Sequence, residues 1–387
     1  MVAGWSLRRG VLAAIAFLMA LVVGASNSQV GGCGPFSDIN NTIFCPFVLE
    51  IFYLGITTGV TPTTYNPDGD VSRIQMAAFL SRTVDATLKR GSRRVLLRKF
   101  YTPQSASAMG VTTFGTSEPT EVACDGRDVW VSGPTEGKIW RVRGSDGRIL
   151  DTWTGALQPL GLTAVNGQVV AVGATIPGFL FRIEASKPAG AVTTVATNVG
   201  QHPNDIVSDG SRFWTSNDDG TFSIVTPQPT IPWTVTTVTT GESRLYGALY
   251  DGANIWVRGI GVLLKLDSGG TVLQTVTVGS GKAFPVSDGT NIWSPDDNSN
   301  SLTVVRASSG AVVATLTGNG LDGSNVAAFD GERVLVTNGT GPGVSLWRAS
   351  DLSPLGSVPT GGSPAGACSD GFQFWIATVN GNSLLRF

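Results

Sequence analysis

One stretch of the chain reads Asp251-Gly252-Ala253-Asn254-Ile255-Trp256, a tight turn followed by the start of an apolar strand. Six similar stretches recur at intervals of roughly 40 residues; they lie at 125–130, 166–170, 209–214, 288–293, 330–335 and 370–375. Asp-Gly or Asn-Gly between two apolar runs is a strong local signal for a β-hairpin. The repeat therefore predicts seven units, each built around a hairpin.

More strands follow each hairpin turn. A third apolar strand comes next, as at 137–142 and 302–306, and a second turn leads to a fourth strand, as at 311–317. Seven units of four strands predict a mainly β fold, a seven-bladed β-propeller. The region resembles the YVTN and NHL class of repeat propellers, and the prolines that open its inner strands belong to that pattern: Pro119, Pro159, Pro203 and Pro364. This resemblance implies a fold and no particular activity.

The last unit lacks its fourth strand, because the chain stops at Leu384-Leu385-Arg386-Phe387. Residues 109–115 have the fourth-strand pattern and precede the first complete unit. We expect them to close the last blade, which would leave no open sheet edge and places the propeller at 109–387. Cys124 and Cys368, just before the first and last hairpin turns, become neighbours only if the ring closes. A disulfide between them is expected, with two buried free thiols as the alternative.

The N-terminus has the features of a targeting signal. Arg8 and Arg9 precede the apolar run 11–23, which ends in small residues and is followed by polar ones. This run is short for a bilayer span, so residues 1–25 are predicted to be a cleaved signal peptide, with an uncleaved anchor as the alternative. No membrane span is expected after cleavage, and export would permit disulfides.

The sequence pattern of residues 33–90 differs from that of the repeats that follow, and it predicts a small helical module. An apolar cluster at 47–54 stops at Gly55, as a short helix does, and Ser72 can cap a second helix. Cys33 and Cys45 flank the first turn of the module. A disulfide between them is expected; metal binding is the alternative, although no His or second Cys pair lies near.

Four blocks of this module carry a resemblance to a known family: Phe36-Ser37-Asp38-Ile39, then 54–59, 65–69 and 71–80. In this order they resemble one S-layer homology (SLH) repeat. The resemblance implies that the module holds an exported protein to anionic cell-wall polysaccharide, with Arg73 as the basic residue that takes part. A small spacer that packs on the next domain is the alternative. Residues 91–108 are interpreted as a basic linker, or as a contact to anionic polymer or lipid.

Composition narrows the classes of function. The formal net charge is -2, so no global field attracts nucleic acid. The chain has one histidine, His202, which excludes a zinc centre with several imidazoles, and it has no Gly-x-Ser-x-Gly elbow. We expect no metal and no cofactor.

His202 is the one catalytic candidate, because it opens an inner strand at a mouth of the predicted channel. Streptogramin lyases and related seven-bladed enzymes, by resemblance, use such a mouth with His and Glu partners. The side chains expected near this rim are Glu118, Glu121, Glu242, Arg244 and Tyr246. The alternative is that His202 fills a polar loop.

Tryptophans and paired aspartates are the remaining candidates for ligand binding. Five tryptophans recur at one position of the repeat, which predicts packing between blades: Trp130, Trp214, Trp256, Trp293 and Trp375. Trp153 and Trp233 break this register and are interpreted as surface residues. Asp218-Asp219 and Asp296-Asp297 are interpreted as turn residues or Ca²⁺ ligands.

Two hypotheses for function follow. The favoured one is an exported, noncatalytic cell-surface binding or scaffold protein, whose SLH-like module associates with cell-wall polysaccharide and whose propeller binds a protein or carbohydrate. The other is an exported enzyme of lyase or lactonase type that works at the channel mouth near His202. Acidic and basic groups that converge with His202 on the channel mouth would favour the enzyme, and a lining of Ser, Thr and Gly would favour binding.

Overall fold

The computed structural model describes residues 33, 35–39, 45–53, 56–80, 83, 103, 105–165, 167–341 and 343–387. The chain divides into two units, residues 1–94 and residues 95–387. The predicted signal peptide and most of the predicted linker lie outside the described residues. Within the described part of the chain, no helix is long and apolar enough to cross a membrane.

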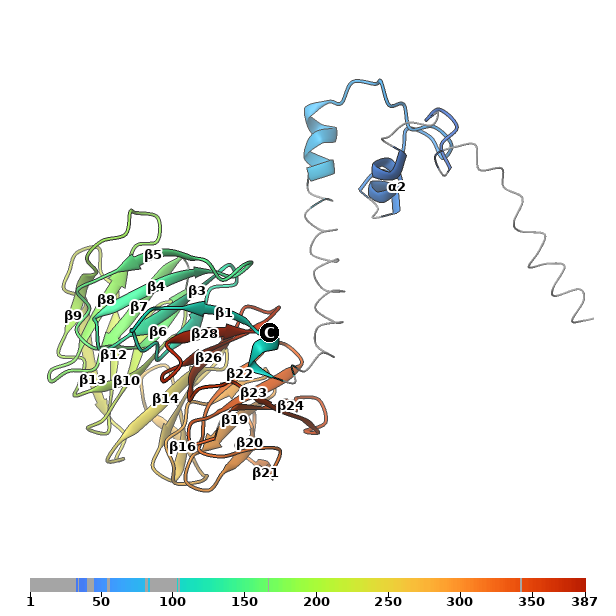
Figure 1. Ribbon diagram of the computed structural model, residues 1–387. Helices are drawn as coiled ribbons and strands as arrows, with labels where there is room; N and C mark the ends of the chain where they lie inside the picture. The colour runs from blue at the N-terminus through green and yellow to red at the C-terminus, as the bar shows by residue number, and fades with distance from the viewer. Residues whose placement is uncertain are drawn as a thin grey trace, which may run out of the picture. The chain divides into compact units, whose positions relative to one another are not determined.

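The second unit contains seven four-stranded antiparallel sheets, which form a seven-bladed propeller (Figure 1). Blade 1 holds β2 (Val122–Cys124), β3 (Asp128–Gly133), β4 (Lys138–Arg143) and β5 (Ile149–Trp153). Blade 2 holds β6 (Pro159–Val165), β7 (Gln168–Gly173), β8 (Phe179–Ile183) and β9 (Thr193–Thr197). Blade 3 holds β10 (Pro203–Ser208), β11 (Phe213–Asn217), β12 (Thr221–Thr226) and β13 (Thr234–Thr239). The predicted fold is confirmed.

The other four blades follow the same plan. Blade 4 holds β14 (Leu245–Tyr250), β15 (Ile255–Gly259), β16 (Val262–Leu266) and β17 (Val272–Thr277). Blade 5 holds β18 (Val286–Ser287), β19 (Asn291–Asp296), β20 (Ser301–Arg306) and β21 (Val312–Thr317). Blade 6 holds β22 (Ser324–Phe329), β23 (Arg333–Asn338), β24 (Gly343–Arg348) and β25 (Pro354–Pro359). Blade 7 holds β26 (Pro364–Ser369), β27 (Phe374–Thr378), β28 (Ser383–Arg386) and β1 (Gly110–Thr113), which follows the short 3-10 helix η1 (Ala106–Ala108).

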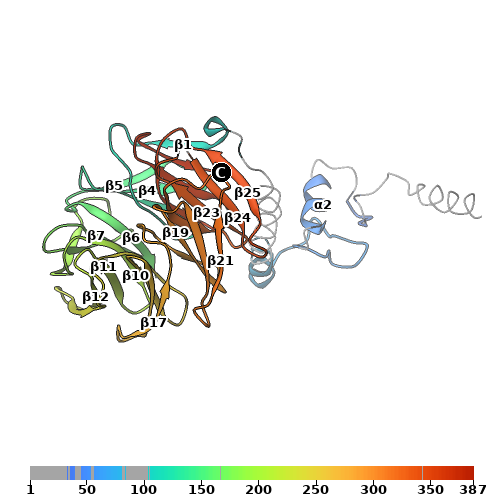
Figure 2. The same ribbon diagram turned by 90° about the horizontal axis from the view of Figure 1, so that it is seen from below.

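The two ends of the propeller sequence meet in blade 7. Strand β1 pairs antiparallel with β28, from Gly110 opposite Arg386 to Thr113 opposite Ser383, and lies beside the C-terminus (Figures 1 and 2). Cys124 and Cys368 form a disulfide with their Cα atoms 5.9 Å apart. Both predictions of ring closure are therefore confirmed. The closed ring pairs the edge that β28 would otherwise leave open.

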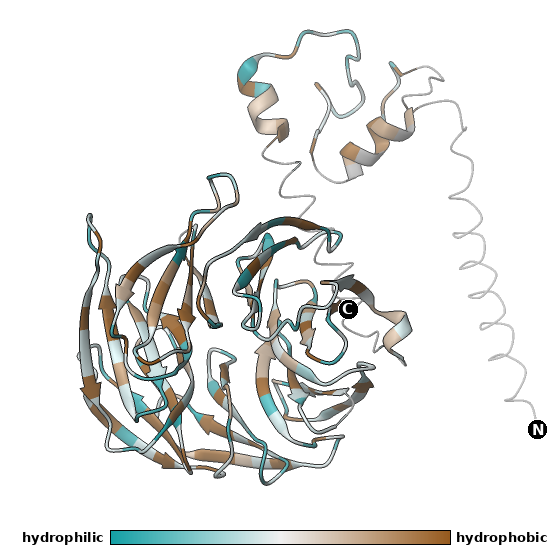
Figure 3. Ribbon diagram, turned by 60° about the vertical axis from the view of Figure 1, so that its left-hand side comes forward, coloured by the Kyte–Doolittle hydropathy of each residue, from teal (hydrophilic) through white to brown (hydrophobic). Residues whose placement is uncertain are grey.

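The repeated tryptophans hold the blades together. All five are fully buried, at 0% exposed, and Figure 3 shows the apolar residues distributed along the propeller strands. Each indole Nε1 also donates a hydrogen bond of 2.7–2.9 Å to the aspartate five residues earlier, in pairs Asp125–Trp130, Asp209–Trp214, Asp251–Trp256, Asp288–Trp293 and Asp370–Trp375. The repeated Asp therefore serves as both turn residue and indole acceptor, a role that sequence reasoning missed.

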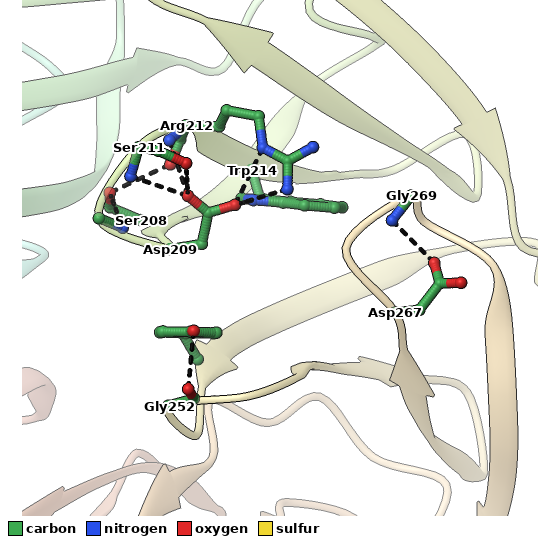
Figure 4. A network of polar contacts seen from close by, with 10 residues as sticks. Ser208, Asp209, Ser211, Arg212, Trp214, Gly252, Asp267 and Gly269 are labelled. Carbon is green, nitrogen blue, oxygen red and sulfur yellow. Dashed lines mark hydrogen bonds and ion pairs between the residues drawn. The ribbon is translucent and has the colours of Figure 1, made fainter.

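Figure 4 shows this turn in blade 3. Asp209 accepts hydrogen bonds from the backbone of Ser211 and Arg212, and the Arg212 guanidinium pairs with it at 2.8 Å. Burial opposes ionisation, but the hydrogen bonds from Trp214 and Ser211 outweigh it and hold the pKa of Asp209 below its ordinary value. The Asp209 carboxylate thus stays ionised at neutral pH, and its hydrogen bonds hold the turn in place.

Two tryptophans interpreted as surface residues are buried, so that prediction is wrong. Trp153 is 3% exposed and lies against Trp130 with ring centroids 5.4 Å apart. Trp233 is 4% exposed, stacks on Phe213, and donates its backbone N–H to Val195 of blade 2. Because the outer part of a blade packs against a neighbouring blade, a large ring there is covered although it breaks the repeat.

The first unit has a small core of its own. Helix α2 (Cys45–Tyr53) covers a cluster of buried residues: Cys33, Phe36, Ile39 and Val48. Cys33 and Cys45 form the predicted disulfide, with Cα atoms 5.5 Å apart. Residues 73–80 form the second helix, and Ser72 and Gln75 exchange hydrogen bonds as a capping box at its start.

Candidate functional sites

Three of the four SLH-like blocks meet in the first unit. The Asp38 carboxylate accepts hydrogen bonds from the backbone N–H groups of Tyr65 (2.8 Å) and Asn66 (2.6 Å). Both hydrogen bonds lower the pKa of Asp38, and the bond from Tyr65 has the larger effect. Phe36 lies 5.4 Å from the Tyr65 ring, and Gly59 adopts φ +77 beneath Phe36, where any Cβ would collide. The spacing of these blocks in the sequence is thus explained by direct contacts between them.

Arg73 occupies the first position of the helix at residues 73–80, directly after the capping Ser72. Its side chain is exposed. Ile74, beside it, is 84% exposed. This end of the module therefore presents a cation next to apolar surface.

A second candidate site lies in the propeller, where the first strands of the blades surround the central channel. Glu121 precedes β2 of blade 1, Asp205 lies in β10 of blade 3, and Lys282 precedes β18 of blade 5. Asp205 accepts hydrogen bonds from the N–H groups of Ile206 (2.8 Å) and of Ala248 in blade 4 (2.9 Å). Three separate blades therefore contribute ionisable side chains to this site, and these side chains influence one another's pKa values.

Burial raises the pKa of both carboxyl groups of this site. It raises the pKa of Glu121 to about 8, with the Asp205 charge adding to the effect, and it raises the pKa of Asp205 to about 7. The Lys282 ammonium acts in the opposite direction on both groups. Near neutral pH the pair can hold and release a proton, which is the property of a general acid and base.

Small residues make room for these acids. A Cβ added to Gly366 would lie 2.6 Å from the Thr120 carbonyl and 2.7 Å from the Glu121 carboxylate. A Cβ on Gly161 would lie 2.7 Å from the Asp205 Cα. Each acid and each of these glycines stands two residues after a proline, so this shared offset was the sequence signal for the site. The sequence analysis expected Glu121 near the rim without using this offset, and it missed Asp205 and Lys282.

His202 lies at the start of β10 but is tied to the neighbouring blade. Its Nδ1 is 2.8 Å from the Ala174 carbonyl oxygen, its backbone N–H donates to Thr175, and its side chain is exposed. Among the other expected rim residues, Arg244 forms an ion pair with Asp218 at 3.2 Å. The group of interacting charges in the channel is Glu121, Asp205 and Lys282.

At least one aspartate of each pair has a structural role. Asp219 accepts hydrogen bonds from Thr221 in its own turn. Asp296 is buried with Arg258, which lies 3.1 Å away and is 0% exposed. The described residues contain no group of three or more His, Cys, Asp or Glu side chains placed to hold a metal ion.

The channel acids predict a pH dependence of stability. Because the pKa of Glu121 is higher in the folded protein than in the unfolded chain, the folded state binds more protons between the two values, and stability falls as pH rises toward 8. Glu121→Gln should match the wild type near pH 5 and exceed it near pH 9 by roughly 3–4 kcal/mol, with a higher Tm. Thermal unfolding across this range measures the effect, and parallel curves for the two proteins would contradict it.

Comparisons with known proteins agree with this description of the two units. Residues 35–77 match the S-layer homology domain family. No curated protein sequence matches the chain. Among solved structures, a catalytically inactive virginiamycin B lyase from Staphylococcus aureus with quinupristin has a TM-score of 0.58 and 13% identity, over 72% of this chain and 98% of that one.

Two further structures share the fold. A streptogramin B lyase has a TM-score of 0.58 and 14% identity, over 72% of this chain and 95% of that one. The hydrazine synthase of Kuenenia stuttgartiensis has a TM-score of 0.60 and 15% identity, over 71% and 97% of the two chains. At these identities the likeness defines the fold: the protein carries a seven-bladed β-propeller. It also carries an S-layer homology domain at residues 35–77, which indicates association with the bacterial cell surface.

Proposed function

We propose that the protein is an exported bacterial cell-surface protein with a binding function. The SLH domain associates with cell-wall polysaccharide, and the propeller presents its loops and grooves to a carbohydrate or protein ligand. The match of residues 35–77 to the SLH family carries this proposal. The two disulfides agree with export, because such bonds persist in oxidising compartments.

Arg73 is the residue proposed to contact the polysaccharide. It is exposed at the start of its helix, and a guanidinium there can pair with an anionic group by two parallel hydrogen bonds. The contact of a single surface cation is weak, so several copies on one polymer would strengthen attachment through avidity.

Cosedimentation with purified cell-wall sacculi tests the proposal. Residues 26–387 should pellet with the sacculi, and a form lacking 33–90 should stay in solution. Arg73→Gln should weaken pelleting about tenfold, whereas Arg127→Gln, which removes an exposed arginine from the propeller, should change nothing. Unchanged pelleting of Arg73→Gln would remove that residue from the proposal.

A second candidate is an exported propeller enzyme of lyase or lactonase type. One observation favours it, namely the interaction of Glu121, Asp205 and Lys282 within the channel. For this candidate the acids replace His202 as the proposed proton carriers. Conversion of quinupristin by the wild type and its loss in Glu121→Gln would support a lyase; no conversion would leave the binding function alone.

A further inference from the structure

A basic side chain closes some of the grooves between neighbouring blades, at the end where the Asp-Gly turns lie. In blade 1, Arg141 stands 5.5 Å from the Trp130 ring centroid and donates a hydrogen bond to the Ala185 carbonyl of blade 2 (3.4 Å). In blade 4, Lys265 stands 5.2 Å from the Trp256 ring centroid and donates to the Ala307 carbonyl of blade 5 (2.9 Å). A cation thus bridges from one blade to a carbonyl of the next.

The groove between blades 5 and 6 lacks this cation. Trp293 pairs in register with Val304, where Trp130 pairs with Arg141 and Trp256 pairs with Lys265. The corresponding carbonyl belongs to Ala349, whose N–H bonds the Glu332 carbonyl as the Ala307 N–H bonds that of Thr290. Within the described part of the chain, no side chain donates a hydrogen bond to the Ala349 carbonyl.

This groove is hollow. It contains a cavity of about 570 Å³, lined by Asp288, Asn291, Arg306, Phe329, Glu332, Ala349, Asp351 and other residues of blades 5 and 6. That volume lies in the range of small-molecule sites and exceeds what one lysine side chain fills. A ligand bound there would therefore extend beyond the position of the absent cation.

A buried acceptor in the groove has no partner. Asn291 is 7% exposed, and its Nδ2 donates to Asp288 at 3.1 Å. Its Oδ1 is buried and receives no hydrogen bond from the described residues. A buried acceptor left in this state costs free energy that a ligand donor would recover.

The chemistry of the lining selects the ligand. The Asn291 Oδ1 and the Ala349 carbonyl can accept hydrogen bonds from a ligand. Three carboxylates line the groove against the Arg306 guanidinium, and even with Asp351 paired to Arg348 at 3.3 Å the remaining two leave it with net negative charge. Ammonium and guanidinium groups are donors only and carry the complementary charge. We propose that the groove between blades 5 and 6 binds a ligand with a primary ammonium or guanidinium group, seated where Arg141 and Lys265 lie in the grooves after blades 1 and 4.

Calorimetric titration of residues 26–387 with three compounds tests this proposal. Nα-acetyl-lysine amide should bind with one site per chain, and its neutral analogue Nα,Nε-diacetyl-lysine amide should bind at least about tenfold more weakly. Cadaverine separates the two sources of an ammonium group: tighter binding of cadaverine assigns the site to free diamines, and tighter binding of the lysine amide assigns it to polypeptides. No binding of either cation, or equal binding of the neutral analogue, would overturn the proposal.

Two substitutions locate the site. Val304→Lys supplies the missing cation and should abolish binding of the lysine amide. Lys265→Val makes the groove between blades 4 and 5 resemble this one and should raise the stoichiometry from one site to two. Unchanged affinity in a folded Val304→Lys variant would overturn the assignment. If that variant fails to fold, the stoichiometry of Lys265→Val decides in its place. The proposal does not depend on the function of the SLH domain.

Discussion

Replacement of Cys124 and Cys368 by serine is expected to lower the free energy of unfolding of the propeller by about 3–5 kcal/mol. The bond joins β2 of the first blade to β26 of the last, across 244 residues of sequence. Cross-linking such distant positions restricts the unfolded chain strongly, and here it also holds the seam of the ring. Chemical denaturation of the oxidised wild type and the double variant measures the difference.

The matched control is the other disulfide. Cys33 and Cys45 lie in the first unit, so replacing both with serine should leave the unfolding of the propeller unchanged. Equal propeller stability in the wild type and the Cys124→Ser/Cys368→Ser variant would show that strand β1 closes the ring without help from the bond.

Arg258→Met is expected to cost about 3–5 kcal/mol of stability, because it leaves the Asp296 carboxylate buried without its cation. Arg258 donates hydrogen bonds to the carbonyls of Gly259 (2.7 Å), Val262 (2.9 Å) and Gly281 (3.2 Å). Burial lowers the pKa of Arg258 to about 10, so the residue stays charged at neutral pH. The side chain therefore ties the hairpin of blade 4 to the loop that opens blade 5.

Two comparisons separate the buried charge from the lost packing. Arg258→Met/Asp296→Asn should recover part of the loss, since no carboxylate then remains without its cation. Arg143→Met breaks a partly exposed pair with Asp146 and should cost less than about 1 kcal/mol. If Arg258→Met cost no more than Arg143→Met, the buried pair would not be what holds blades 4 and 5 together.

The propeller was predictable because its signals are local and repeated. Each Asp-Gly turn and its tryptophan occur in a short window, and the missing strand at the C-terminus pointed to residues 109–115. The positions of Trp153 and Trp233 were mispredicted for the opposite reason. Their burial depends on the neighbouring blade, which no local window contains.

The candidate sites were predictable only in part. Glu121 was expected near the channel, but its interaction with Asp205 and Lys282 joins residues of blades 1, 3 and 5, and distances across a ring cannot be obtained from spacing along a chain. The open groove beside Asn291 could likewise not be predicted from the sequence. It follows from two positions of blade 5: Val304 stands where blades 1 and 4 have Arg141 and Lys265, and Asn291 stands three residues after the turn aspartate, so both positions are compared through the strand register.

Cosedimentation with sacculi remains the most direct measurement of surface association. The account predicts that residues 26–387 pellet with the cell wall and that the form lacking residues 33–90 stays in the supernatant, with both propellers folded. Equal pelleting of the two forms would contradict the account, because wall binding would then belong to the propeller and not to the SLH domain at residues 35–77.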